Sequence, residues 1–339
     1  MNDIHDAAEL LSGVIRVTPS LPAGWIEKNY GVEVRLKCEN LQRAGSFKIR
    51  GAYNRIARLT PEERAKGVVC ASAGNHAQGV ALAAQLLGIE ATVFMPVGAP
   101  IPKFKATEGY GAKVHFHGIT IDEALVAASE FSESTGAIFI HPFDHEDIVA
   151  GQATIGLEIL EQNPDVKTVV VCLGGGGLLA GAAMAIKEQR PDIKVIGVQA
   201  AEAAAYPASL EAGSPQKLAR MATMADGIAV GRPGDIPFAM IQKYVDEVIT
   251  VSEESLARTL LLTMERSKLI VEAAGIAALT AILDNPSHFE GPVVATLSGG
   301  NIDPQLLNRV IRSGLSAAGR FMTLQVRLPD RPGALAELL

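Results

Sequence analysis

The stretch "VVVCLGGGGLLAGAAMAIKE", residues 169–188, decides the fold. Its first apolar residues predict a buried strand, four consecutive glycines follow (Gly174, Gly175, Gly176 and Gly177), and an apolar-faced helix comes directly after them. Glycines let the backbone approach a ligand closely, and N–H groups at a helix N-terminus favour an anion. A flexible turn is the alternative, but a run of glycines loses much backbone entropy on folding. We therefore expect this loop to bind a phosphate group.

The same alternation of apolar runs and helical patterns continues along the chain. Helical patterns over about 76–88, 102–110 and 120–135 separate the earlier apolar runs. The predicted buried strands are 67–74, 91–96, 112–117, 137–142, 167–174, 194–199, 247–252 and 293–299. Alternating β and α elements imply parallel sheets covered by helices. We therefore predict an α/β protein of two lobes, each a parallel-rich sheet flanked by helices, with a site at the carboxyl ends of strands.

The composition limits the binding partners and the cellular location that we expect. The 339 residues include 30 Lys and Arg against 37 Asp and Glu, which gives a net charge of −7. That balance argues against nucleic acid or an anionic membrane surface. The N-terminus has no signal-peptide pattern, and no apolar run is long enough to span a bilayer. The three scattered cysteines form no CxxC and are typical of buried thiols in a reducing cytoplasm, so we predict a cytoplasmic protein.

A lysine stands at the start of a predicted helix in "RAGSFKIRGAYNRI", residues 43–56. Taken alone, Lys48 is more typical of a solvated surface residue. Beside a phosphate loop it gains a second interpretation, because a phosphate-bearing aldehyde cofactor needs a lysine for a Schiff base. Burial would lower the pKa of such a lysine and leave part of it neutral.

Two further junctions place polar groups at the ends of predicted strands. In "ASAGNHAQGVALAAQLLG" (71–88), Ser72, Gly74, Asn75 and His76 precede or open a helix, so their N–H groups could bind a substrate carboxylate. An ordinary N-cap is the alternative interpretation. In "TLSGGNID" (296–303), Ser298 stands at the end of a strand.

A dinucleotide site is a rival for the glycine loop, because Gly175, Gly177 and Ala180 match GxGxxA. That fingerprint requires an acidic residue at the end of the next strand to hold a ribose. The next predicted strand ends instead in Gln199 and Ala200. We therefore do not expect a nicotinamide enzyme.

Together these segments resemble the pyridoxal-phosphate β-family (fold type II) and, within it, the threonine/serine dehydratases. "GSFKIRGA" resembles the family's lysine motif, with Lys48 in the Schiff-base place and Phe47 beside the cofactor ring. "SAGNHAQG" resembles its substrate loop, with Asn75 bonding the ring oxygen, and "GGGGL", from Gly174 to Leu178, resembles its phosphate cradle. "SGGNID" puts Ser298 at the pyridine nitrogen. The resemblance covers roughly residues 5 to 315.

This resemblance implies an enzyme that uses pyridoxal 5'-phosphate and Lys48 to eliminate water from a small hydroxy amino acid. The products would be 2-oxobutanoate and ammonia from L-threonine, and pyruvate from L-serine; a role towards isoleucine biosynthesis and a catabolic role both stay open. We expect a homodimer or homotetramer. The corresponding division is a large cofactor domain (1–57 and 146–318) and a small substrate-loop domain (58–145).

Other family members remain as alternatives. The serine racemases carry a second serine, as the acid/base on the other face of the substrate, where this chain has Ala73. Because alanine cannot carry a proton, Ala73 favours elimination, for which Lys48 alone suffices. A cysteine-synthase relative and a non-catalytic amino-acid sensor are the remaining interpretations. The histidine and carboxylate clusters are weak, and we predict no metal site.

The C-terminal segment has a different pattern. "VRLPDRPGALAEL", residues 326–338, resembles the opening of an ACT domain, an amino-acid-sensing module. We therefore expect residues 319–339 to hold a strand, a turn and the start of a helix, as the incomplete beginning of an ACT-like module.

Overall fold

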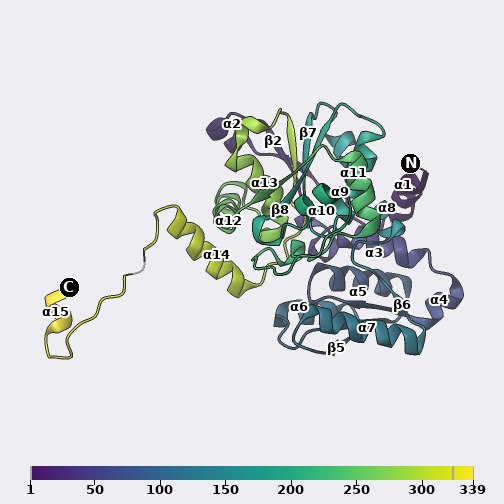
Figure 1. Ribbon diagram of the computed structural model, residues 1–339, viewed down its shortest axis with the longest axis horizontal. Helices are drawn as coiled ribbons and strands as arrows, with labels where there is room; N and C mark the ends of the chain where they lie inside the picture. Colours follow the sequence, from purple (N-terminus) through teal and green to yellow (C-terminus); the bar gives the residue numbers. More distant parts are fainter. Residues whose placement is uncertain (1, 323, 339) are drawn as a thin grey trace.

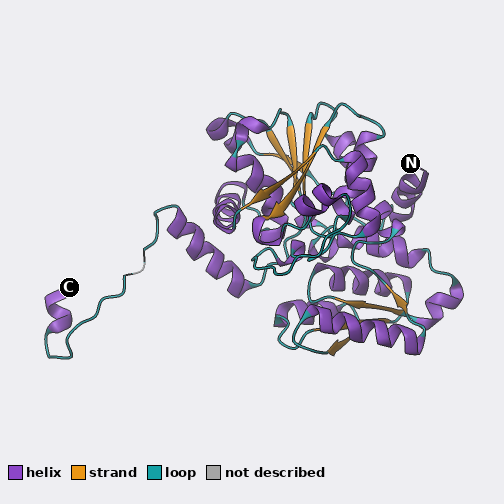
Figure 2. Ribbon diagram, in the orientation of Figure 1, coloured by secondary structure: helices purple, strands orange, loops and turns teal. Residues whose placement is uncertain are grey.

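The computed structural model describes residues 2–322 and 324–338 and has two lobes (Figure 1). One lobe is built on a six-stranded sheet in the order β1-β2-β10-β7-β8-β9, and the other on a four-stranded sheet in the order β5-β4-β3-β6. Every strand pair is parallel except β1 with β2. Helices flank both sheets (Figure 2). The predicted α/β class with two parallel-rich sheets is confirmed.

The strands are short and mostly buried. Their bounds are β1 Ser20–Pro22, β2 Val34–Lys37, β3 Val68–Ala71, β4 Ala91–Met95, β5 Lys113–Phe116, β6 Ile138–Phe139, β7 Thr168–Cys172, β8 Lys194–Ala200, β9 Glu247–Val251 and β10 Val293–Thr296. The helices are α1 Asn2–Leu11, α2 Gly24–Tyr30, α3 Lys48–Ala57, α4 Pro61–Lys66, α5 Asn75–Leu87, α6 Ile101–Gly109, α7 Ile121–Thr135, α8 Glu146–Gln162, α9 Gly177–Lys187, α10 Tyr206–Ala212, α11 Asp235–Tyr244, α12 Glu253–Ser267, α13 Ala273–Asp284, α14 Pro304–Ala317 and α15 Ala334–Leu338.

Eight of these strands, β3 to β10, lie where apolar runs predict them, whereas β1 and β2 were not predicted. The reason lies in β2, "VRLK", whose Arg35 and Lys37 read as polar in the sequence. In the fold Lys37 is fully buried, with its charge paired to Glu158 on α8. Arg35 is paired to Asp165, which precedes β7. Tertiary partners therefore allow a charged strand in the interior of the sheet.

The larger sheet is covered on both faces. Helix α13 packs against β7, β8 and β10, while α9 packs against β7 and α8; the two groups lie on either side of the sheet in Figure 1. All five residues of β7 are buried. A strand buried on both faces reads as a continuous apolar run, which explains why "TVVVC" shows no alternation.

Helix α3 lies between the lobes, because it packs against α5 of the smaller lobe and α8 of the larger one. Glycines permit both contacts. A Cβ on Gly151 of α8 would lie 2.6 Å from the carbonyl oxygen of Arg50, and a Cβ on Gly79 of α5 would lie 3.1 Å from the carbonyl carbon of Lys48. The backbones therefore meet closely at the start of α3, and both lobes fix the position of Lys48.

The C-terminal segment differs from its expectation. Helix α14 packs against α12, and the chain then extends away from the body to α15 (Figure 1). The described residues 320–322 and 324–333 contain no strand, so the predicted strand is wrong for this structure, whereas the short helix is present. An isolated strand has no partner for its backbone groups and cannot bury its own face. Accordingly Met322 and Leu324 are 74% and 72% exposed.

Two further findings concern the thiols and the helices. The three cysteines, Cys38, Cys70 and Cys172, are buried and free. Among the helices that the structure describes, none combines the length and apolar character needed to cross a membrane.

Candidate active site

A cavity of about 680 Å³ brings together residues from both lobes. The predicted site residues that line it are Phe47, Lys48, Ser72, Gly74, Asn75, His76, Gly174, Gly175, Gly176, Gly177, Leu178 and Ser298. Several of them directly follow β3, β7 and β10, that is, the carboxyl ends of parallel strands. Ligands of open α/β sheets bind at such ends. Every residue singled out as a candidate from the sequence therefore lies at one place.

Lys48 is the first residue of α3, and its side chain enters the cavity. Its Nζ donates a hydrogen bond to the carbonyl oxygen of Pro142 at 2.8 Å and lies 5.2 Å from the centroid of the Phe47 ring. Burial lowers the Lys48 pKa to about 8, and the negative groups nearby oppose this only in part. A sizeable fraction of the amine is therefore neutral near neutral pH, as a nucleophile or base requires.

The glycine loop leads from β7 into α9, and Gly176 caps that helix with a φ of 106°. Its path leaves no room for side chains. A Cβ on Gly175 would lie 2.4 Å from the Phe143 ring, and a Cβ on Gly176 would lie 2.1 Å from the Tyr206 hydroxyl. The first N–H groups of α9 have no partner within the helix. The loop thus provides backbone donors in a close-fitting cradle, which suits a phosphate.

The loop at 72–76 opens α5, with Gly74 as the N-cap residue. The N–H of Gly74 donates to Ser72 Oγ at 3.1 Å, so the serine side chain shapes the loop. The His76 ring is buried, with Nε2 2.8 Å from the carbonyl oxygen of Ile140, and burial lowers its pKa to about 3. The ring is therefore neutral and tied to the end of β6. Backbone N–H groups remain as the donors that suit a carboxylate here.

Ser298 follows β10 and has a partner that was not anticipated from the sequence. The Cys172 thiol donates to Ser298 Oγ at 3.2 Å. Burial raises the Cys172 pKa to about 11, so this group stays a thiol. Because the serine oxygen already accepts a hydrogen bond from the thiol, its own hydroxyl hydrogen is available to an acceptor such as a ring nitrogen.

Glu272 is a site residue that sequence reasoning missed. It lines the cavity, is 4% exposed and accepts a hydrogen bond from Asn75 Nδ2. Burial raises its pKa to about 7. The available signal was a lone acid in the apolar run "LIVEAAGIAALTAIL", residues 269–283. A charged residue in such a run needs a partner or a function.

An ion pair between the lobes was also missed. Lys103 of α6, in the smaller lobe, pairs with Asp226, which belongs to the larger lobe, and both line the cavity. In sequence the two residues lie 123 positions apart, so nothing local indicates their contact. Among the residues that the structure describes, no group of three or more His, Cys, Asp or Glu could hold a metal ion.

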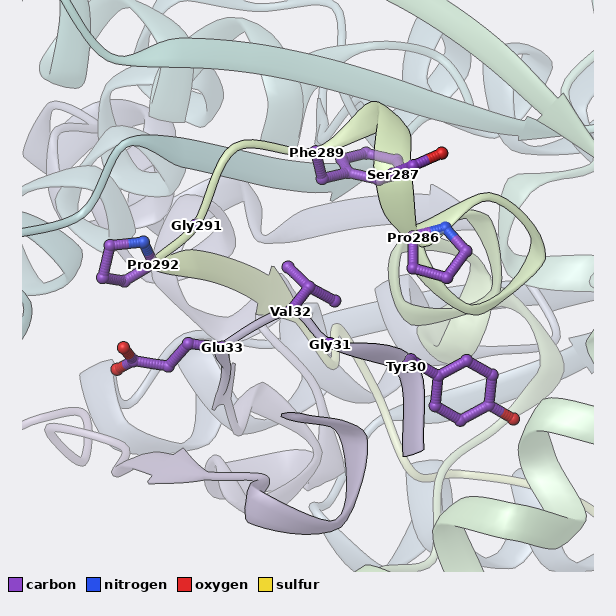
Figure 3. Close-up of a pocket in the computed structure, with 9 residues that line it drawn as sticks. All are labelled: Tyr30, Gly31, Val32, Glu33, Pro286, Ser287, Phe289, Gly291 and Pro292. Carbon is purple, nitrogen blue, oxygen red and sulfur yellow. The ribbon is translucent and has the colours of Figure 1, made fainter. Parts of the chain in front are cut away.

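A second cavity, of about 560 Å³, lies at the other end of the larger sheet, before the amino ends of β2 and β10 (Figure 3). Its lining is Tyr30, Gly31, Val32, Glu33, Pro286, Ser287, Phe289, Gly291 and Pro292. Glu33, its single charged lining residue, is paired with Arg35 at 2.7 Å. Its lining contains no Lys, Arg or His, so this cavity offers none of the amine chemistry of the first one.

Comparison with known proteins agrees with this geometry. A family model described as "Pyridoxal-phosphate dependent enzyme" matches residues 11–299. The L-threonine ammonia-lyase of Thermotoga maritima is 48% identical over 339 residues, covering 100% of this chain and 84% of that protein. Two solved structures are similar: the processed form of threonine deaminase isoform 2 from Solanum lycopersicum (TM-score 0.87, 37% identity, 94% of this chain and 86% of that one) and maize serine racemase (TM-score 0.87, 33% identity, 94% and 98%).

Proposed function

The chain belongs to the family of pyridoxal-phosphate-dependent enzymes, and from this premise we propose that it is an L-threonine ammonia-lyase. It eliminates water from L-threonine, water then hydrolyses the enamine product to 2-oxobutanoate and ammonia, and L-serine is converted to pyruvate in the same way. The observation that carries the proposal is a buried, poorly compensated lysine in the cavity that also holds the glycine loop and Ser298.

The residues present fit pyridoxal phosphate. A Cβ on Gly175 or Gly176 would collide with Phe143 or Tyr206, so the loop offers its backbone donors to the phosphate. Lys48, Asn75 and Ser298 all line the cavity; Lys48 Nζ would hold the aldehyde carbon, Asn75 the ring oxygen and Ser298 the ring nitrogen. The bound cofactor supplies an electron-withdrawing ring and an aldehyde that the substrate amine can join. Side chains and backbone groups of this chain bind the substrate and transfer the protons.

Binding and proton transfer are divided between the two lobes. The N–H groups that open α5, at residues 74–76, take the substrate carboxylate. Lys48 Nζ, partly neutral because its pKa is lowered to about 8, takes the proton from the substrate α-carbon as a general base. The carbonyl oxygen of Pro142 accepts a hydrogen bond from this amine and so positions it at the cavity wall. Ser298 would offer the ring nitrogen a neutral hydroxyl, which would keep the ring a moderate electron sink suited to rapid loss of a leaving group.

Serine racemisation is the second candidate, because maize serine racemase is a structural neighbour. Racemisation needs a proton donor on the face of the substrate opposite Lys48. In this chain Ala73 lines the cavity where the racemases carry a serine, and a methyl group cannot transfer a proton. The elimination reaction requires no such group and is favoured.

A product assay separates the candidates. The protein loaded with pyridoxal phosphate is given L-threonine, then L-serine, and 2-oxo acid, ammonia and D-serine are measured. We expect 2-oxobutanoate and ammonia in equal amounts from threonine, pyruvate from serine, and no D-serine above the background rate. D-serine as the main product, or no 2-oxo acid from either substrate, would contradict the proposal.

We propose three further properties. The division into a large domain (1–57 and 146–318) and a small one (58–145) is supported by the two separate sheets. The start of an ACT-like module at 319–339 is supported by the sequence motif and by the exposed apolar side chains of this projecting segment. A cytoplasmic location is supported by the free cysteines. We also propose a homodimer or homotetramer, which light scattering after size-exclusion chromatography measures directly.

A further inference from the structure

The orientation of one amide decides how Asn75 can act. A carboxamide presents either an oxygen acceptor or two N–H donors, and only a donor can bond the oxygen of a cofactor ring. Two side chains hold this amide. Asn301 Nδ2 donates to Asn75 Oδ1 at 2.8 Å, and Asn75 Nδ2 donates to Glu272 Oε1.

The orientation of Asn301 is fixed independently of Asn75. Its Nδ2 also donates to the carbonyl oxygen of Ala44 at 2.7 Å. A backbone carbonyl can only accept, so the nitrogen of Asn301 must face Ala44. The second hydrogen of the same nitrogen then points at Asn75, whose amide must accept this hydrogen bond through its oxygen. The Ala44 carbonyl thus fixes the orientation of the Asn301 amide, and the Asn301 amide in turn fixes that of Asn75.

The backbone that presents this carbonyl is unusual. Ala44 has a φ of 57° and Gly45 a φ of 69°, both in the left-handed region, which is uncommon for alanine. A Cβ on Gly45 would lie 2.2 Å from Asn301 Oδ1. Two backbone bonds hold the segments together, from Phe47 N to Ser298 O at 3.1 Å and from Gly300 N to Gly45 O at 2.9 Å. Strain of this kind persists where the surroundings impose it, often at functional sites.

Glu272 constrains the amide from the other side. Its backbone N–H donates to the carbonyl oxygen of Gly299 at 3.0 Å, which places the side chain beside that glycine. A Cβ on Gly299 would lie 2.3 Å from Glu272 Oε1 and 3.1 Å from Asn75 Nδ2. The contact between Glu272 and Asn75 therefore depends on a glycine at 299. It uses one of the two hydrogens on Asn75 Nδ2.

We propose that Asn301 and Glu272 are positioning residues that lock the Asn75 amide with its nitrogen towards the cavity. The remaining N–H of Asn75 is thereby kept ready for the ring oxygen of pyridoxal phosphate. This inference rests on the proposed placing of the cofactor against Asn75. It assigns a purpose to Asn301, Glu272 and the strained turn at Ala44, each of which acts through Asn75.

A double-mutant cycle on cofactor affinity tests the inference. The dissociation constant of pyridoxal phosphate is measured for the wild type, Asn75→Ala, Asn301→Ala and the double variant. Asn301→Ala should weaken binding by about tenfold, and it should add less than about twofold in the Asn75→Ala background, because its effect passes through Asn75. Asn40→Ala is the matched control: it removes a similar amide-to-carbonyl bond (to Ile270 O, 3.1 Å) beside Gly300, and should leave the constant within about twofold of wild type.

The outcomes are distinguishable from failure of the proposed function. If Asn301→Ala weakens binding equally in both backgrounds, Asn301 only braces the loops and the inference is wrong. If Asn75→Ala leaves the constant unchanged, the cofactor role of Asn75 is wrong, whereas threonine turnover by the wild type reports on the activity separately. Should Asn301→Ala fail to fold, Asn301→Asp serves in its place: it keeps the shape but cannot donate, and wild-type affinity in it would overturn the inference.

Discussion

Helix α3 contributes to two clusters of buried polar side chains, through Lys48 and, two residues later, through Arg50. The clusters differ in how their charges are compensated. Arg50 belongs to the first, with Lys37, Glu39 and Glu158. Its guanidinium donates to both oxygens of Glu39, at 2.9 and 2.8 Å, and to Glu158. The Lys37 amine is paired with Glu158 and also bonds Thr18 O and Gln162. Each buried charge of this cluster meets an opposite one.

Lys48 belongs to the second cluster, which it forms with Glu272 and Ser298 in the cavity. Its amine has no comparable partner. The bond that the described part of the chain gives its amine is the one to Pro142 O, a neutral carbonyl. Burial accordingly lowers its pKa to about 8, and burial raises that of Glu272 to about 7. Burial alone therefore does not separate structure from function here. Pairing does: burial lowers the pKa of Lys37 as well, but Glu158 holds that amine, whereas the Lys48 amine meets only a neutral carbonyl and is ready to take a ligand.

Removing the unpaired lysine should have the largest effect on activity. Lys48→Ala is expected to lower kcat for L-threonine by about a thousandfold, because the general base is lost. The cofactor-free protein should keep its free energy of unfolding or gain some, since a poorly compensated buried amine is removed. Lys113→Ala, at an exposed lysine paired with Glu90, is the control and should retain activity. Normal turnover by Lys48→Ala would contradict the role of Lys48 as the general base.

Breaking the paired cluster should instead affect stability. Arg50→Ala leaves Glu39 buried without its partner, and we expect a loss of about 3–5 kcal/mol in the free energy of unfolding. Chemical denaturation measures this. Arg232→Ala is the control, because its pair with Asp235 lies at the surface and contributes little. An Arg50→Ala protein as stable as the wild type would show that the first cluster is not the structural one.

A new charge in the second cluster should cost activity more moderately. Ser298→Asp places a carboxylate where a neutral hydroxyl now faces the ring nitrogen, and it should lower kcat for elimination by about tenfold or more, or ~1.4 kcal/mol of barrier. Ser298→Thr keeps the hydroxyl and should stay within about threefold of the wild type. Steady-state kinetics with L-threonine compare the two variants. Unchanged turnover in Ser298→Asp would count against the assigned role of Ser298.

The smallest of the expected effects is a pH dependence. An amine must lose its proton to attack an aldehyde, and the lowered Lys48 pKa of about 8 means that it does so at lower pH than an ordinary lysine. The rate at which cofactor-free protein captures pyridoxal phosphate should rise roughly fivefold from pH 7 to pH 8 and level off above about pH 9. Stopped-flow absorbance follows the capture. A rate that still climbs about sevenfold from pH 9 to pH 10 would indicate an ordinary, solvated lysine.

The comparison also explains which parts of the fold can be predicted from the sequence. Apolar runs such as "TVVVC" identify β7 because burial on both faces leaves a local signature. The charged strand β2 leaves none, because Lys37 is buried only through Glu158, which lies 121 positions away. The expected C-terminal strand fails for the opposite reason: its alternating pattern is present, but the described chain offers it no partner strand.

The candidate site divides in the same way. Lys48, the glycine loop, the 72–76 loop and Ser298 stand out locally, since each follows a predicted strand or opens a helix. Glu272 shows only as a lone acid in an apolar run and Asn301 does not stand out, because their roles come from contacts with Asn75 across 197 and 226 positions. Long-range contacts of this kind are set by the fold and leave no mark in the spacing of residues.

The central claim is that Lys48, and not the buried Lys37, carries the chemistry. Borohydride reduction of the protein with bound pyridoxal phosphate, followed by peptide mass spectrometry, tests this directly, because it fixes the cofactor to the amine that holds it. We predict the reduced cofactor on Lys48 and none on Lys37. A protein that deaminates L-threonine while carrying the label on another lysine, or on none, would contradict the account.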